Sequence, residues 1–177
     1  LHAALQALEA QINAGVQHPL MRELELPYPI LVGRVSGGEW SSSVPDRLEA
    51  EGRLGVPVGA DAAEARAQLE AVVAGALDDG EAPAAITWTG GAFLPGETAV
   101  DHAWTRRVAD AIAHERRRPA RIVGVPYGAD MRLFTARGIP CVMAGTTGIE
   151  RAHAVDEWVA VDELVTLARV VMRVLGP

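Results

Sequence analysis

The sequence contains no lysine, because all 16 of its basic residues are arginine. Without a lysine amine the chain cannot carry a Schiff base, a lysine general base or a Walker-type phosphate loop. The 23 acidic residues outnumber the basic ones and give a net charge of −7, which argues against a nucleic-acid partner. The densest basic run, Arg116-Arg117-Arg118 with Arg121, fits the solvated end of a helix, where cations favour the helix dipole.

Cysteine and long apolar runs are also scarce. Cys141 is the single cysteine of the chain, so an intrachain disulfide is excluded and a cytoplasmic location is expected. It lies in the apolar run 139–143, where a buried and unreactive thiol is expected. No apolar run approaches the roughly 18 residues of a membrane span, so we expect no contact with membranes.

The common catalytic motifs are missing as well. The sequence contains no H-E-x-x-H, H-x-D, G-x-S-x-G or G-x-G-x-x-G pattern and no Glu-Glu pair. A serine hydrolase could combine one of Ser41 to Ser43 with His153 and Asp156. The strained nucleophile elbow is absent, however, and these serines fit a turn.

Periodicity predicts the order α-β-β-α-β for the first half of the chain. We expect a helix over 1–14, strands over 28–35 and 47–56, a helix capped by Asp61, and a short strand over 85–89. Strand 47–56 alternates apolar and charged residues, so one of its faces should be buried. The order is one strand short of the ferredoxin-like β-α-β-β-α-β unit. Either three strands complete the sheet, or a first strand lies upstream of this sequence, and we expect the latter.

After a Gly/Pro-rich break at 90–98, the second half predicts the order α-β-α-β-α of an α/β domain. The first four elements are expected at 101–117, 121–125, 129–138 and 139–144. Segment 139–144 is apolar throughout, as in a buried parallel strand. The final helix should bury a stripe formed by Val161, Leu164, Val165, Ala168, Val171 and Met172. We expect two domains, 1–92 and 93–177.

The loop 145–157 follows the predicted buried strand, at the edge where α/β sheets bind ligands. His153 lies in this loop, and Asp156 or Glu157 could orient one of its ring nitrogens, as in many metal sites. From spacing alone, a histidine bonded to a backbone carbonyl is the simpler interpretation, because a zinc site needs three or four protein ligands.

Two blocks of the sequence resemble the family-20 metallopeptidases, which include acetylornithine deacetylase, succinyl-diaminopimelate desuccinylase, aminoacylase and glutamate carboxypeptidase. The first block runs from Gly37-Gly38 through Ser43-Val44-Pro45 to Glu51 and is similar to a strand pair of the family's lid, or dimerisation, domain. The second block is similar to the pattern (S/G)xDxR…G(I/V)P…GxG…AHxxDE. It comprises Gly128 to Arg132, Gly138-Ile139-Pro140 and Gly145 to Glu157.

The resemblance implies an α/β protein in two parts. Residues 1–92 would form an α+β lid, ferredoxin-like βαββαβ without its first strand, and residues 93–177 the C-terminal part of a zinc-peptidase-like α/β catalytic domain. His153 would be the last ligand of a site for two zinc ions, which cobalt could replace. The family's other ligands and its general base lie upstream of the lid, so the chain resembles a C-terminal fragment without a catalytic base of its own.

The implied reaction is hydrolysis of the amide bond of N-acyl amino acids or small peptides by a homodimer that pairs through the lid. Arg132 could bind the substrate carboxylate, although an ion pair on a helix surface explains it equally well. The close backbone approach to substrate would come from Gly145, Thr146, Thr147 and Gly148.

The lid contributes two further candidate contacts. Ser42 lies where the family often has an asparagine, and Arg53 could replace the family's lid arginine, whose position is taken here by Gly55. Two other functions remain open from the sequence: a non-catalytic dimerisation or binding module, and a catalytically silent relative.

Overall fold

The computed structural model describes residues 1–77 and 84–176 and has mixed α/β structure. The described residues form five α-helices, two short 3-10 helices and one antiparallel sheet of two strands. They divide into two compact units: Leu1–Pro95 with Gly124–Gly128, and Gly96–Val123 with Ala129–Pro177. The domain limits 1–92 and 93–177 stay a prediction.

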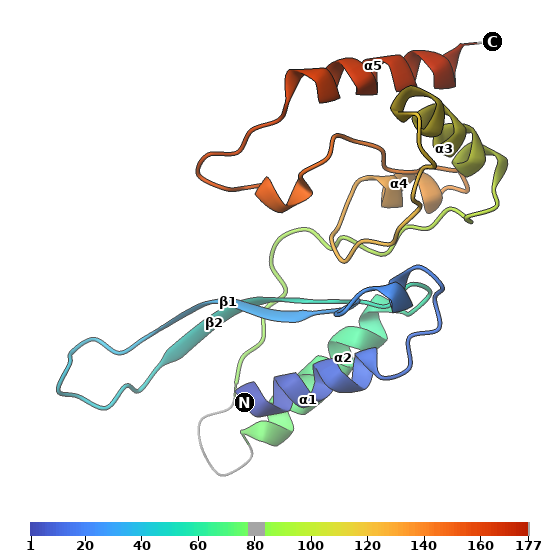
Figure 1. Cartoon of the computed structure of the whole chain (residues 1–177). Helices are drawn as coiled ribbons and strands as arrows, with labels where there is room; N and C mark the ends of the chain where they lie inside the picture. The colour runs from blue at the N-terminus through green and yellow to red at the C-terminus, as the bar shows by residue number, and fades with distance from the viewer. Residues whose placement is uncertain (78–83, 177) are drawn as a thin grey trace. The chain divides into compact units, whose positions relative to one another are not determined.

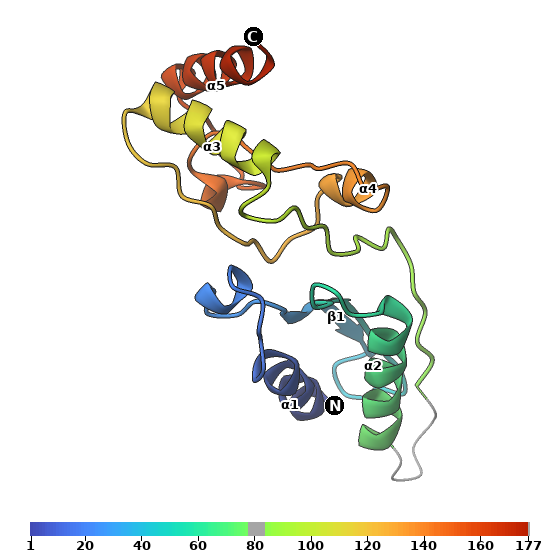
Figure 2. The ribbon, with the colours of Figure 1, turned by 90° about the vertical axis from the view of Figure 1, so that its right-hand side faces the viewer.

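The first unit contains the two predicted helices and two of its three predicted strands. Figures 1 and 2 show the helices α1 and α2 side by side on the same face of the sheet. The elements are α1 (His2–Asn13), the 3-10 helix η1 (Met21–Glu23), β1 (Ile30–Gly37), β2 (Leu48–Leu54) and α2 (Ala62–Ala76).

Side-chain hydrogen bonds fix the end of α1 and the start of α2. The predicted cap Asp61 begins α2, because its carboxylate accepts from the backbone N–H groups of Ala63 at 2.6 Å and Glu64 at 3.2 Å. At the end of α1 the Asn13 amide donates to the Tyr28 carbonyl and accepts from the Tyr28 N–H, both at 2.9 Å. Asn13 thus ties α1 to the chain that enters β1.

The hairpin β1–β2 is exposed on both faces. Its strands pair from Ile30 with Leu54 to Gly37 with Leu48, with an irregularity between Val32 and Arg34. The prediction of one buried face for strand 47–56 is wrong, because every residue of β2 except Leu54 is exposed. Within the first unit α1 contacts β1, and Figure 1 shows the loop end of the hairpin extending past α1 and α2.

Three predicted strands, 85–89, 121–125 and 139–144, have irregular backbone in the structure. A strand exists only with a hydrogen-bonded neighbour. Within the described residues only β1 and β2 provide such neighbours for each other. The segment 85–89 instead returns to α2 through Trp88, whose indole N–H donates to Glu70 at 2.7 Å and whose ring lies under Arg66.

The apolar segment 139–144 is also less buried than predicted. Ile139 is 49% exposed and Met143 44%, while Cys141 is half-buried rather than buried. The hydroxyl of Thr98 replaces a neighbouring strand here, because it accepts from the Cys141 N–H at 3.0 Å and donates to the Cys141 carbonyl at 2.6 Å.

The second unit is built on two packed helices, α3 (Ala103–Arg116) and α5 (Val161–Leu175). Its small core comprises Val108, Ala111, Val170 and Val174, against which Trp104, Ile112 and Val142 pack. Trp104, Val108 and Ile112 recur every four residues in the sequence, a spacing that predicts the inward face that α3 shows. The shorter elements are α4 (Met131–Thr135) and the 3-10 helix η2 (Ile149–Arg151). None of the described helices is long and apolar enough to cross a membrane.

The prediction of a buried stripe on α5 is wrong, because all six residues of that stripe are exposed. The apolar side of this helix is a broad arc that includes both the predicted stripe and Val170 and Val174, so periodicity alone does not select the part of it that packs. The face that α5 turns to α3 carries Val170 and Val174 together with the carboxylate Glu163, which pairs with Arg116. Arg116 is therefore half-buried rather than solvated, whereas Arg117 and Arg118 are exposed as expected.

Candidate functional site

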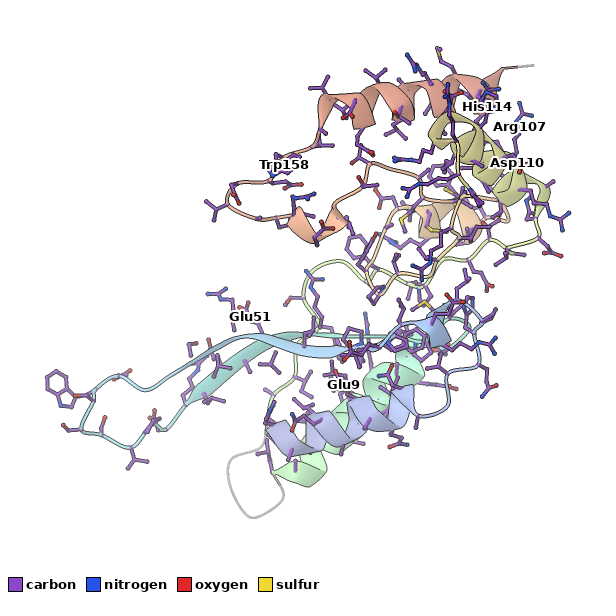
Figure 3. The ribbon with its side chains drawn as sticks, viewed as in Figure 1. Glu9, Glu51, Arg107, Asp110, His114 and Trp158 are labelled. Carbon is purple, nitrogen blue, oxygen red and sulfur yellow. The ribbon has the colours of Figure 1, made fainter. Side chains whose placement is uncertain are left out.

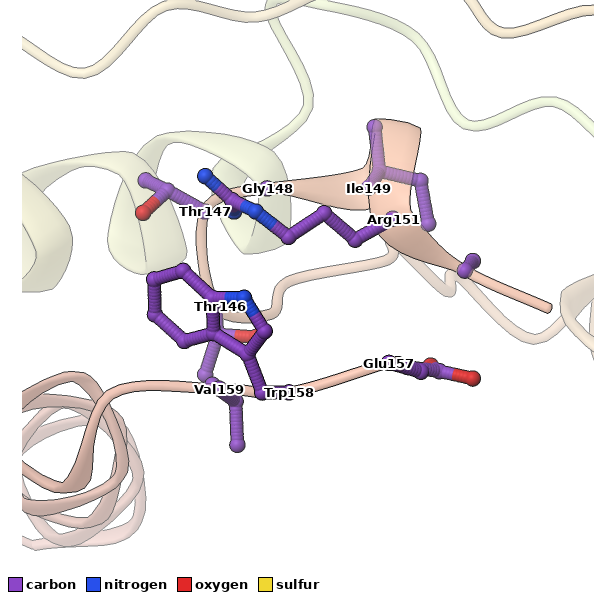
Figure 4. Close-up of a pocket in the computed structure, with 9 residues that line it drawn as sticks. Thr146, Thr147, Gly148, Ile149, Arg151, Glu157, Trp158 and Val159 are labelled. Carbon is purple, nitrogen blue, oxygen red and sulfur yellow. The ribbon is translucent and has the colours of Figure 1, made fainter. Parts of the chain in front are cut away.

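The loop between segment 139–144 and α5 encloses a small pocket of about 240 Å³. Figure 4 shows its walls, which come from two segments of the loop, 146–148 (the first limb) and 157–159 (the second limb), with η2 between them. The residues that line it are Thr146, Thr147, Gly148, Ile149, Arg151, Ala152, Glu157, Trp158 and Val159. The structure therefore brings three of the predicted substrate contacts, Thr146, Thr147 and Gly148, into one pocket, while Gly145 lies exposed beside them.

Glu163 anchors the first part of the loop, at Thr147, to the helix pair formed by α3 and α5. One carboxylate oxygen of Glu163 accepts from the Thr147 backbone N–H at 3.1 Å. The same carboxylate receives both terminal nitrogens of Arg116, at 2.9 and 2.6 Å. The hydrogen bonds from Arg116, and then that from Thr147, lower the pKa of Glu163 to about 2. Glu163 is thus ionised at neutral pH and joins α3, α5 and the loop.

The second limb is held by an arginine stacked on an indole ring. The Arg151 guanidinium carbon lies 4.4 Å from the centre of the Trp158 ring. The Nη1 atom of Arg151 also lies 3.5 Å from Oε1 of Glu150. Gly148 leaves room for this arrangement, since a Cβ on it would overlap Nη1 of Arg151. Gly148 also has a backbone φ of 94°, a value that residues other than glycine rarely adopt.

His153 lies at the edge of this pocket in a strained backbone conformation. Its φ is 66°, and its neighbours Ala152 and Glu157 line the pocket while His153 itself is exposed. The Glu157 carboxylate does contact His153, but it accepts from the backbone N–H at 3.0 Å rather than from the imidazole. Backbone strain of this kind concentrates at functional sites, where surrounding contacts hold it in place.

The other predicted site residues lie outside the pocket. Arg132 is half-buried on α4, Arg53 is exposed on β2, and Ser42 is exposed in the hairpin loop. The position of the family's lid arginine is closed to any side chain, because a Cβ on Gly55 would lie 2.6 Å from the Tyr28 carbonyl carbon. The role of Arg53 as a lid contact stays a prediction.

The residues that the structure describes do not by themselves form a metal site. No group of three or more histidine, cysteine, aspartate or glutamate side chains is placed to hold an ion between residues 1–77 or 84–176. The carboxylate nearest to His153 in the hydrogen-bond network, Glu157, is occupied by a backbone N–H. A zinc ion needs three or four protein ligands, so His153 alone does not meet the requirement.

Comparison with known families places this loop in context. The model of peptidase family M20/M25/M40 matches residues 4–176, nearly the whole chain. The chain belongs to peptidase family M20/M25/M40. Members of the M20/M25/M40 family are hydrolases of peptide and amide bonds, typically with bound metal and often as dimers. No curated protein and no solved structure matches the chain.

Arg151 and Trp158, which line this pocket, and Glu163, which accepts from the Thr147 N–H, were not predicted as site residues from the sequence. An acidic residue in the first turn of a predicted helix is a common feature, and it does not reveal that Glu163 reaches back to the loop. Arg151 and Trp158 are seven positions apart in a loop, a separation that carries no periodic signal. Their contact depends on the turn that Gly148 and His153 make with positive φ.

Proposed function

We propose that this chain contributes to the active site of a metal-dependent amidohydrolase that cleaves N-acyl amino acids or small peptides. Membership of the M20/M25/M40 family supports the reaction class. The observation that carries the proposal is the loop itself, in which the strained His153 borders a pocket lined by Thr146, Thr147 and Gly148. Strain at a histidine beside a pocket is a feature of functional sites.

Within this proposal His153 provides one ligand to a centre of two zinc ions, for which cobalt could substitute. The other ligands and the general base would come from residues outside this sequence, so that the chain is the C-terminal part of a longer enzyme and is inactive alone. The contribution of this chain is then a ligand and a wall of the substrate pocket.

The substrate would contact the pocket mainly through backbone groups. Gly145 and Gly148 allow close approach, and the two threonines between them add hydroxyl groups to the wall. Arg132 would bind the substrate carboxylate as a bidentate fork. Arg53 and Ser42 would add contacts from the lid. We place the enzyme in the cytoplasm, with neither nucleic acid nor membrane as a partner.

The central test is His153→Ala in the complete gene product. Release of free amine from N-acetyl amino acids should fall more than about 100-fold, because losing a metal ligand costs at least as much as losing the hydrogen-bond partner that orients one. His2→Ala removes an exposed histidine from α1 and should leave the rate unchanged. Unchanged activity of the His153 variant would remove this residue from the site.

A second test asks whether the 177-residue chain alone contains a complete zinc site. Zinc titrated into the 177-residue chain should bind weakly or not at all, because His153 has no described ligands beside it. A tight, stoichiometric zinc ion in this chain would contradict the proposal that the remaining ligands lie elsewhere.

The hairpin favours a second candidate function, a dimerisation module. Val35, Trp40 and Leu48 are 62%, 73% and 65% exposed, and both strands have an open edge. Such edges are ready to pair with a second chain. The two functions are compatible, since dimers are common in the family.

The dimerisation candidate is tested by sedimentation of the chain. Val35→Lys places a charge on β1 and should shift the chain from dimer to monomer. Val44→Lys makes the same change in the hairpin loop and should leave the dimer intact. A wild-type chain that is monomeric at all concentrations would reject this candidate, without bearing on the hydrolase.

A further inference from the structure

A second hollow lies on the helix pair, apart from the pocket of the loop. It has a volume of about 690 Å³ and is lined by Ala103, Arg106, Arg107, Asp110, Ala111, His114 and Arg173. Figure 3 shows the labelled side chains of Arg107, Asp110 and His114 on one side of α3. It shares no lining residue with the loop pocket. The volume lies within the range of small-molecule sites, about 300–1,000 Å³.

The hollow follows from the spacing of small and long residues on α3. Residues three, four and seven positions apart share one side of a helix, so Arg106, Arg107, Asp110 and His114 line up. The lining also includes two alanines on α3, of which Ala111 is only 3% exposed. The hollow is open to solvent: Ala111 lies at its base, the arginines of α3 rise beside it, and Arg173 of α5 lies on the opposite side.

Cations dominate this lining although the chain as a whole carries a net charge of −7. The lining carries three guanidinium groups and one carboxylate, that of Asp110, and a second carboxylate, Glu115, pairs with Arg173 beside it. Arg107 donates through Nη2 to the Gly176 carbonyl at 2.6 Å, and Arg173 through Nε to Glu115 at 2.8 Å. Each of these two bonds occupies one of three guanidinium nitrogens, and both hold the arginine in place at the wall.

A carboxylate next to the hollow already experiences its positive potential. The hydrogen bond from Arg173 lowers the pKa of Glu115, and the charges of His114 and Arg169 lower it further. An anion placed in the hollow would be stabilised by the same charges.

We propose that this hollow binds a small anion of the phosphate class with at least two negative charges, such as pyrophosphate or a phosphate monoester. Arginine is the preferred partner of phosphate oxygens because its planar fork donates two parallel hydrogen bonds. Guanidinium groups on opposite walls suit a tetrahedral phosphate, whose oxygens point in several directions, better than a planar carboxylate. The lining residues include no aromatic ring, so no base is stacked and the phosphate itself is the recognised group.

The test is calorimetric titration of the full chain with inorganic pyrophosphate at low ionic strength, where charge interactions are least screened. Arg106→Gln should weaken binding about tenfold or more, as expected for the loss of a charge-assisted hydrogen bond. Arg34→Gln removes the same charge from the exposed hairpin and should change the affinity less than twofold. Arg106 is exposed, so its substitution is not expected to unfold the chain.

The probes distinguish the class of anion. Inorganic phosphate and glycerol phosphate should bind and compete with pyrophosphate, whereas citrate, a planar-carboxylate trianion, should bind at least tenfold more weakly. Absence of heat with pyrophosphate up to about 10 mM would overturn the proposal. It would also be overturned if citrate bound equally well, or if Arg106→Gln and Arg34→Gln behaved alike. None of these results depends on hydrolase activity.

Discussion

The hairpin β1–β2 and the helix pair α3–α5 hold together in opposite ways. The hairpin is closed by backbone hydrogen bonds along its whole length, yet nearly all of its side chains are exposed. The helix pair has no backbone bond between its members and is joined by a small core with Val108 and Val170, an Arg116–Glu163 ion pair and an Arg173–Glu115 ion pair.

The difference shows which surface of the chain is already used. On the facing sides of α3 and α5 the side chains find their partners within the described chain, so substitution there should cost folding free energy. The outer apolar stripe of α5, which includes Val161 and Met172, is exposed like the hairpin. The apolar side chains of the hairpin are left for contacts that the folded unit itself does not need. Sequence changes in the hairpin should therefore affect association more than folding.

The largest expected effect breaks the helix pair at its centre. Val170 is 3% exposed, and Val170→Asp should lower the free energy of unfolding by about 3 kcal/mol or more, because an unpaired charge is buried. Val35→Asp makes the same change on the exposed hairpin and should cost no more than about 0.5 kcal/mol. Urea unfolding followed by hydrogen exchange of the α3 and α5 amides measures both. Equal losses would show that the hairpin is as tightly covered as the helix pair.

A smaller effect is expected in the loop that the helix pair anchors. Gly148→Ala should cost about 2–3 kcal/mol, because the residue has positive φ and its Cβ would displace Arg151 from Trp158. Gly138→Ala is the matched control, with a φ of 70° but open space around the Cβ, and should cost about 1 kcal/mol. If both variants lose the same amount of stability in urea, the stack on Trp158 contributes nothing.

The smallest effect appears on acidification. The pKa of Glu163 falls from 4.5 to about 2 on folding, so its contribution is complete above pH 4.5 and is lost as the pH falls through about 2. Thermal unfolding of the wild type and of Glu163→Gln should therefore differ at neutral pH and converge at acid pH.

The hairpin provides the control for this pH series. Glu51 pairs with Arg34, but both side chains are more than two-thirds exposed, and such pairs contribute little. Glu51→Gln should leave the midpoint of thermal unfolding near that of the wild type at each pH. A wild type and Glu163→Gln that remain apart at the lowest pH would show that Glu163 acts through packing rather than charge.

Helices and the hairpin could be predicted from the sequence because their contacts are local. The cap Asp61 and the apolar side of α3 follow from spacing alone, and β1 and β2 are consecutive strands joined directly by the loop 38–47. The segments 85–89, 121–125 and 139–144 have the composition of strands, yet each would need a neighbour distant in sequence. No described residue is placed to provide one, and composition does not reveal that.

The sequence indicated which loop holds the candidate site, but it did not reveal the side-chain contacts that shape that loop. The family resemblance pointed to residues 145–148, and Thr146, Thr147 and Gly148 line the pocket, while their contact with substrate stays a prediction. The anchors Glu163, Arg151 and Trp158 were not predicted. Each depends on which side of a helix or turn faces the loop, and α5 turned a different face to α3 than its apolar stripe indicated.

The stack of Arg151 on Trp158 has a consequence for spectroscopy. Trp40 lies in the hairpin loop, Trp88 against α2, Trp104 at the helix-pair core and Trp158 at the pocket. The four indoles thus have four different environments, two of them under an arginine. Variants that keep one tryptophan at a time would report by fluorescence on the hairpin, the α2 contact, the core or the pocket separately.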